Sequence, residues 1–165
     1  MDHFATWVTG TGASRMMQHL PGLIVYLQTI HILAVAMVLS AAVMISLRML
    51  RVTHIQTMAQ TVHRFMPWLW TGLGILLTTG LLQILAEPKR TLNYNYAFML
   101  KMAMVIVAVG LNSAFQLSLQ TNAARWEDDP HAKTMTQGFA VSMLLLWFAI
   151  SVAGRWIAYA RLEVM

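Results

Sequence analysis

Few side chains in this sequence can do chemistry, and the most informative ones lie inside long apolar segments. His31, Lys101 and Arg155 each stand several residues in from the end of such a segment. Ionisable groups within a bilayer are costly, so they usually face the interior of a helix bundle and serve a function. A histidine ring can ligate a metal ion, while lysine and arginine can hold an anionic group beside it.

The segments that must position these residues predict a membrane protein. The chain has 165 residues, of which 58% are hydrophobic and 10% are charged, whereas a soluble domain carries about 25% charged residues. A helix needs about 20 apolar residues to cross a bilayer. Four stretches meet this requirement, at about residues 23–47, 65–86, 96–119 and 139–160. We expect an all-α, integral membrane four-helix bundle with up-down-up-down topology, in which residues 1–165 form a single transmembrane domain.

Residues 1–20 do not have the pattern of a signal peptide. Asp2 and His3 stand where a basic region would be, and no apolar core follows them. The apolar residues of this segment alternate with small and polar ones, which predicts a short interfacial segment. Farther along, Pro67 is expected in the first turn of the second long helix, where its missing N–H does no harm.

The distribution of basic residues predicts an orientation. Four crossings place both termini on one face of the membrane. The opposite face would carry five basic residues, and the face of the termini four: Arg48, Arg51, Arg64, Arg125 and Lys133, against Arg15, Lys89, Arg90 and Arg161. By the positive-inside rule this small margin places the termini outside the cytoplasm. The net charge of +5 is spread over the segment ends, which is typical of contact with anionic lipid rather than with nucleic acid.

Apart from Asn112, the candidate polar residues on the four predicted helices lie in the membrane half nearest the termini. Within each helix they are separated by three or four residues and so share a face: Gln28 with His31, Thr79 with Gln83, and Ser151 with Arg155 and then Tyr159. On the third helix Lys101 shares its face with Asn112, eleven residues later. These positions together predict one polar pocket, lined by all four helices and open toward the termini.

The predicted helices contain no Asp or Glu, so an anionic ligand would balance the two cations of this pocket. Haem b fits, with His31 as axial iron ligand and with Lys101 and Arg155 pairing with the propionates. The remaining polar groups of this candidate site are Gln28, Gln83, Asn112 and Tyr159. The second axial position stays unassigned. Two simpler interpretations remain open: the cations extend to lipid headgroups, and His31 is a hydrogen-bonded packing residue.

Copper is the alternative cofactor. The chain has fourteen methionines, and thioethers favour Cu(I), so copper would be held by His31 and methionines. Methionine is also an ordinary filler of apolar cores. His54 and His63 offer a weaker second metal site at the opposite face. The chain has no cysteine, which excludes a thiolate site, and no hydrolytic motif supports hydrolytic catalysis.

A family resemblance rests on the central part of the chain, HRFMPWLWTGLGILLTTGLLQILAEPKRTLNYNYAFMLKMAMVIVAVGLN. This run resembles the core of the CopD-type membrane domain. The matching features are Arg64, the pair Thr79-Gly80, Lys101 and Asn112. The resemblance implies movement of copper or a small solute across the inner membrane.

Two further resemblances cover different lengths of the chain. Nearly the whole chain is similar to an uncharacterised family of small bacterial inner-membrane proteins, through Pro67, Trp68, Trp70 and the final helix LLLWFAISVAGRWIAYA. More distantly, His31 and Lys101 match positions in HemJ-type protoporphyrinogen oxidases, which implies haem b. The Pro-Arg-Leu-Phe motif that follows the histidine in those oxidases is absent here, so their activity does not carry over.

The sequence therefore predicts a b-type haem-binding integral membrane protein that works in electron transfer or redox chemistry, with quinone or a partner protein. One alternative is CopD-like transport. Another is a non-catalytic membrane subunit of a larger complex. Gly72, Gly74 and Gly80 would allow close helix contact within the bundle or in a homo-oligomer.

Overall fold

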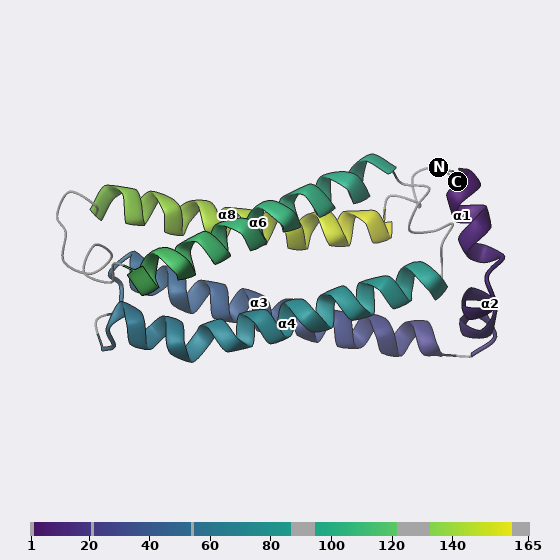
Figure 1. Ribbon diagram of the computed structural model, residues 1–165, viewed down its shortest axis with the longest axis horizontal. Helices are drawn as coiled ribbons and strands as arrows, with labels where there is room; N and C mark the ends of the chain where they lie inside the picture. The colour runs from purple at the N-terminus through teal and green to yellow at the C-terminus, as the bar shows by residue number, and fades with distance from the viewer. Residues whose placement is uncertain (1, 21, 54, 87–94, 122–132, 160–165) are drawn as a thin grey trace.

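The computed structural model describes residues 2–20, 22–53, 55–86, 95–121 and 133–159. These residues form six helices and no strand (Figure 1): α1 Asp2–Thr9, α2 Gly12–Gln18, α3 Leu23–Met49, α4 Met58–Ala86, α6 Asn95–Thr121 and α8 Lys133–Tyr159. The predicted all-α fold class is confirmed.

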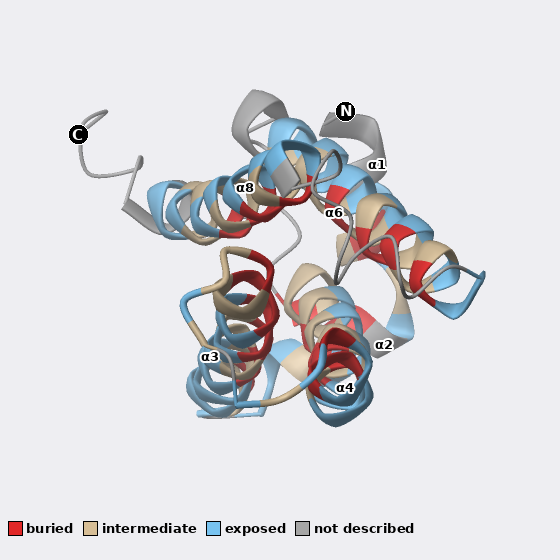
Figure 2. Ribbon diagram, turned by 90° about the vertical axis from the view of Figure 1, so that its left-hand side faces the viewer, coloured by how far each residue is buried: buried red, intermediate tan, exposed pale blue. Residues whose placement is uncertain are grey.

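The four long helices are each long and apolar enough to cross a membrane. They run in alternating directions along the long axis of the molecule (Figure 1). Figure 2 shows their buried sides facing one another and their exposed sides facing outward. Large apolar side chains on the outer sides are more than half exposed, among them Leu33, Leu77, Ile106 and Phe148. Such a surface suits hydrocarbon rather than water, and the chain is therefore a multi-pass membrane protein.

The bundle core is built around the pair formed by α3 and α4, with α8 packed against α3 and α6 against α8. Small side chains allow the backbones to approach. At Gly72 of α4, an added Cβ would lie 2.6 Å from Cγ2 of Val38 on α3. Helix α6 is joined to α4 by a side-chain hydrogen bond of 3.0 Å, which Trp70 Nε1 donates to Gln116 Oε1.

Helix α4 begins at Met58 rather than near residue 65, so the predicted start is wrong. A capping box explains the earlier start: the Gln60 backbone N–H donates to Thr57 Oγ1, and the Thr57 N–H donates to Gln60 Oε1. Pro67 consequently lies inside the helix instead of in its first turn. Helix α8 likewise starts at Lys133 rather than near residue 139.

The predicted interfacial segment forms α1 and α2, which lie across one end of the bundle (Figure 1). The fully buried Ser14 of α2 donates a 2.7 Å hydrogen bond to the carbonyl oxygen of Leu85, in the last turn of α4. Gln18 in turn donates to Ser14 Oγ. These bonds satisfy a carbonyl at a helix end, which has no partner within its own helix, and they fix α2 to the bundle. Trp7 and Met16 remain largely exposed, as suits a membrane interface.

Candidate polar site within the bundle

His31 and Thr79 join α3 to α4 inside the membrane. Nδ1 of His31 lies 2.7 Å from Oγ1 of Thr79. The Thr79 side chain is buried, and the His31 side chain is half-buried. Gly80 follows Thr79, and a Cβ at that position would lie 3.8 Å from Cε1 of His31. The imidazole ring is therefore held on one edge by a hydrogen bond, and Gly80 leaves space for about one methyl group beside Cε1.

The hydrogen bonds of Thr79 are compatible with one tautomer of His31 in particular. A hydroxyl group has a single proton, and Oγ1 of Thr79 lies 2.7 Å from the carbonyl oxygen of Ile75, which can accept it. When the proton is donated there, the hydroxyl oxygen accepts from His31, and Nδ1 carries the proton of the neutral ring. The lone pair then stands on Nε2. This is the arrangement in which a histidine can ligate a metal through Nε2 while its other nitrogen fixes the ring.

Lys101 of α6 lies against Gly154 of α8. A Cβ at position 154 would be 3.1 Å from Nζ and 3.4 Å from Cε of the lysine, so only glycine leaves the ammonium group its full space there. None of the four long helices contains Asp or Glu, so the bundle itself provides no carboxylate for this cation.

The four helices contribute to this site at similar depth. His31 is eight residues after the start of α3, Thr79 seven before the end of α4, Lys101 six after the start of α6, and Gly154 five before the end of α8. At 1.5 Å per residue these positions lie about 8–12 Å from the helix ends. We call His31, Thr79, Lys101 and Gly154 the polar site.

The other predicted site residues are spread more widely. Gln83 donates a 3.5 Å hydrogen bond to the carbonyl oxygen of Leu27, between α4 and α3 and nearer the helix ends. Gln28 is half-buried on α3, and the Arg155 side chain is exposed. Tyr159 ends α8, and its side chain lies outside the described part of the chain. The structure thus brings His31 and Lys101 to one level without burying Arg155 beside them.

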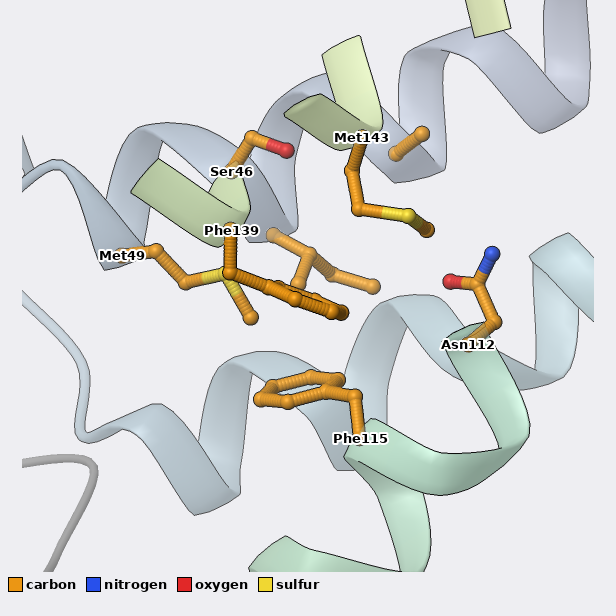
Figure 3. Close-up of a pocket in the computed structure, with 8 residues that line it drawn as sticks. Ser46, Met49, Asn112, Phe115, Phe139 and Met143 are labelled. Carbon is orange, nitrogen blue, oxygen red and sulfur yellow. The ribbon is translucent and has the colours of Figure 1, made fainter. Parts of the chain in front are cut away.

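Asn112 lies at a different cavity, in the opposite half of the bundle. Its side chain is buried and donates a 2.8 Å hydrogen bond to the carbonyl oxygen of Ala108. Figure 3 shows it beside a small cavity between α3, α6 and α8, with Ser46, Phe115, Phe139 and Met143. The cavity has a volume of about 10 Å³, which is the size of a site for one water molecule. Asn112 is therefore separate from the polar site.

The sequence did not single out two residues of the polar site. Thr79 is one of several polar residues near the termini, and its i,i+4 spacing to Gln83 led to the prediction of Gln83 as the site residue. Gly154 precedes Arg155, and the charge of Arg155 led to the prediction of the arginine instead. Among the residues that the structure describes, no three His, Cys, Asp or Glu side chains gather as a metal cluster. His63 is exposed near the start of α4, in the half of the bundle away from His31.

The comparisons with known proteins place the chain in a family. Residues 15–160 match the model of a family of unknown function, DUF6644. The chain belongs to this family, which confirms the predicted membership of an uncharacterised family. No curated protein and no solved structure matches the chain.

Proposed function

We propose that this membrane protein binds b-type haem through Nε2 of His31 and works in electron transfer or redox chemistry. The observation that carries the proposal is the hydrogen bond between His31 Nδ1 and Thr79, which places the lone pair on Nε2 when Nδ1 carries the proton. A packing histidine would also be hydrogen-bonded, so binding of haem by His31→Ala is the measurement that separates the two roles.

The surroundings of His31 fit haem in two respects. Haem carries two propionates, and Lys101 supplies a cation at the level of the histidine, in helices without carboxylates. Glycine stands beside both side chains, at Gly80 next to the ring and at Gly154 next to the ammonium. Lys101 would pair with one propionate, and Arg155, which is exposed near the end of α8, would pair with the other.

The chain's own residues then have distinct tasks. Bound haem supplies a one-electron redox centre. Thr79 fixes the ring plane of His31 and increases its basicity as a ligand through the Nδ1–H bond. Lys101 would compensate the negative charge of the bound group.

We further propose a bacterial inner-membrane location with the termini on the periplasmic side. The support is the resemblance of the final helix and of the Pro67-Trp68 region to small inner-membrane proteins, together with the small excess of basic residues at the opposite face. The distant resemblance to HemJ-type proteins, through His31 and Lys101, agrees with haem as the cofactor.

The direct test is titration of the purified protein with haem in detergent, followed by absorption. We expect saturable binding by the wild-type chain and by His63→Ala, whose histidine is exposed and far from the polar site. The variant His31→Ala should bind at least about tenfold more weakly, since it lacks the only proposed iron ligand. Equal binding by His31→Ala would overturn the proposal. Stoichiometric copper in the purified protein, lost in His31→Ala, would favour the copper alternative instead.

A further inference from the structure

Two buried polar side chains line the small cavity between α3, α6 and α8. Ser46 of α3 is 2% exposed and Asn112 of α6 is 4% exposed. Figure 3 shows the Ser46 hydroxyl and the Asn112 carboxamide both directed into the space beside Met143. All other lining side chains are apolar. These two residues therefore supply the polar side-chain atoms of the cavity, and they come from two different helices.

Both side chains keep unused hydrogen-bonding capacity. The helical serines Ser113 and Ser151 each donate to the carbonyl four residues earlier in their own helix. Ser46 makes no such bond, and its hydroxyl has no hydrogen-bond partner in the described part of the chain. Asn112 donates one N–H to the carbonyl of Ala108, while its Oδ1 accepts from no group among the described residues. Buried polar groups without partners are costly, so a bound molecule that can both donate and accept would stabilise this pair.

The size and the chemistry of the cavity select the molecule. Its volume of about 10 Å³ is close to the roughly 10–15 Å³ that one water molecule requires. No charged side chain lines the cavity, so an ion would lie there without a counter-charge. A water molecule is neutral and has two donor and two acceptor sites. It matches a hydroxyl, which can donate or accept, and an amide oxygen, which only accepts.

The position of the cavity gives water a short path to it. Ser46 is three residues before the end of α3, about 4.5 Å along the helix, and Met49, the last residue of α3, also lines the cavity. The cavity therefore lies near the membrane face away from the polar site. Helix α6 packs against α8 rather than against α3, so a molecule bound here would link two helices that have little direct contact.

We propose that the cavity binds a single water molecule that joins α3 to α6. The water donates one proton to Oδ1 of Asn112 and forms its second hydrogen bond with the hydroxyl of Ser46. It is a structural ligand of the bundle, held in the half of the membrane where the helices offer few other polar contacts. The site shares no residue with the polar site, and it does not require haem to be present.

The test is solid-state nuclear magnetic resonance of the full-length protein in lipid bilayers, without added haem, with magnetisation transferred from water to nearby carbons. We expect fast transfer to the side chain of Asn112 and slow transfer to Leu69, which is fully buried and does not line the cavity. Ser46→Val removes the hydroxyl and fills its space, so the fast transfer to Asn112 should be lost. Ser113→Val is the matched control and should keep it, because Ser113 lies outside the cavity.

The link between the helices is tested by a double-mutant cycle, measured as the equilibrium constant for unfolding in mixed micelles. Ser46→Ala and Asn112→Leu should each raise this constant about three- to tenfold, the size of one hydrogen bond. The double variant should raise it by less than the product of the two effects, because both bonds belong to one molecule. Ser151→Ala with Asn112→Leu is the control pair and should be multiplicative, since Ser151 bonds only within α8 and lies outside the cavity.

Transfer to Asn112 that is as slow as transfer to Leu69 would overturn the proposal, and this comparison needs only the wild-type protein if a variant does not fold. Coupling in the cycle without fast transfer would show direct contact between the two side chains and would overturn it as well. Purely multiplicative effects of Ser46→Ala and Asn112→Leu would mean that no molecule is shared. Because no haem is added, the result is independent of the test of His31.

Discussion

Oγ1 of Thr79 lies 2.7 Å from Nδ1 of His31 and donates its own proton to the carbonyl of Ile75, one turn earlier in α4. Two helices thereby fix one ring. With the hydroxyl proton used within α4, the histidine donates the interhelical bond, and Nε2 is left to accept.

Loss of this bond should weaken haem binding while the fold stays intact. Thr79→Val keeps the shape of the side chain but removes the acceptor for Nδ1, so we expect haem affinity to fall about 10–100-fold, as for other partners of metal-ligating histidines. The measurement is the haem titration. Thr78→Val is the matched control, because the exposed Thr78 only donates to the carbonyl of Gly74 in its own helix. If the two variants bind haem equally, Thr79 does not position the ligand.

The ammonium group of Lys101 should need the space that the missing side chain of Gly154 leaves. Gly154→Ala places a Cβ 3.1 Å from Nζ of Lys101, so the ammonium group must move by a few tenths of an ångström. We expect a several-fold loss of haem affinity, roughly 1 kcal/mol. Gly138→Ala on the same helix meets no atom within 4 Å and should leave the affinity unchanged. A loss of affinity in both variants would point to a general effect on α8.

Close packing of α3 on α4 should make Gly72 intolerant of any side chain. Gly72→Ala brings a Cβ to 2.6 Å from Cγ2 of Val38, and Val38 is a stiff, fully packed residue. We expect the variant to lose about 1–3 kcal/mol of stability, as in other overpacked cores. Unfolding in mixed micelles of increasing sodium dodecyl sulfate measures this change.

The control for this packing prediction is Gly74→Ala, two residues farther along α4, where nothing lies within 4 Å of the added Cβ. Alanine favours a helix over glycine, so this variant should be as stable as the wild type or more so. Equal stability of the two variants would contradict the close contact at Gly72.

The hydrogen bond between Trp70 and Gln116 should hold α6 to α4. Trp70→Phe removes the N–H donor and keeps an aromatic ring, and we expect a loss of about 0.5–1.5 kcal/mol. The same unfolding experiment applies. Trp68→Phe is the control, since Trp68 is 59% exposed on the outer side of α4. An equal change in both variants would mean that the interhelical bond contributes nothing.

Depth in the membrane was predictable from the sequence, because each helical residue advances the chain by a fixed 1.5 Å. Counting from the helix ends is enough to place His31 and Lys101 at one level. Rotation of the helices was not predictable in the same way. All sides of these helices are apolar, so spacing alone does not say which side faces inward. Adjacent residues point about 100° apart, and the packing of α8 turns Gly154 toward Lys101 and leaves Arg155 exposed.

Two other differences have local causes. The start of α4 was misplaced because the continuous apolar run begins only near residue 65. The helix itself begins earlier, at the polar capping box formed by Thr57 and Gln60. The cavity at Asn112 depends on how side chains of three helices fit together, and no pattern within one helix contains that information.

The central claim is that His31 ligates haem iron within the bundle. Its most direct test is the reduced-minus-oxidised absorption spectrum of the protein extracted from membranes of cells supplied with haem. We expect a Soret band that shifts on reduction with dithionite in the wild type and in His63→Ala, and no such band in His31→Ala. A wild-type protein that stays colourless after haem is supplied, or an unchanged spectrum in His31→Ala, would contradict the claim.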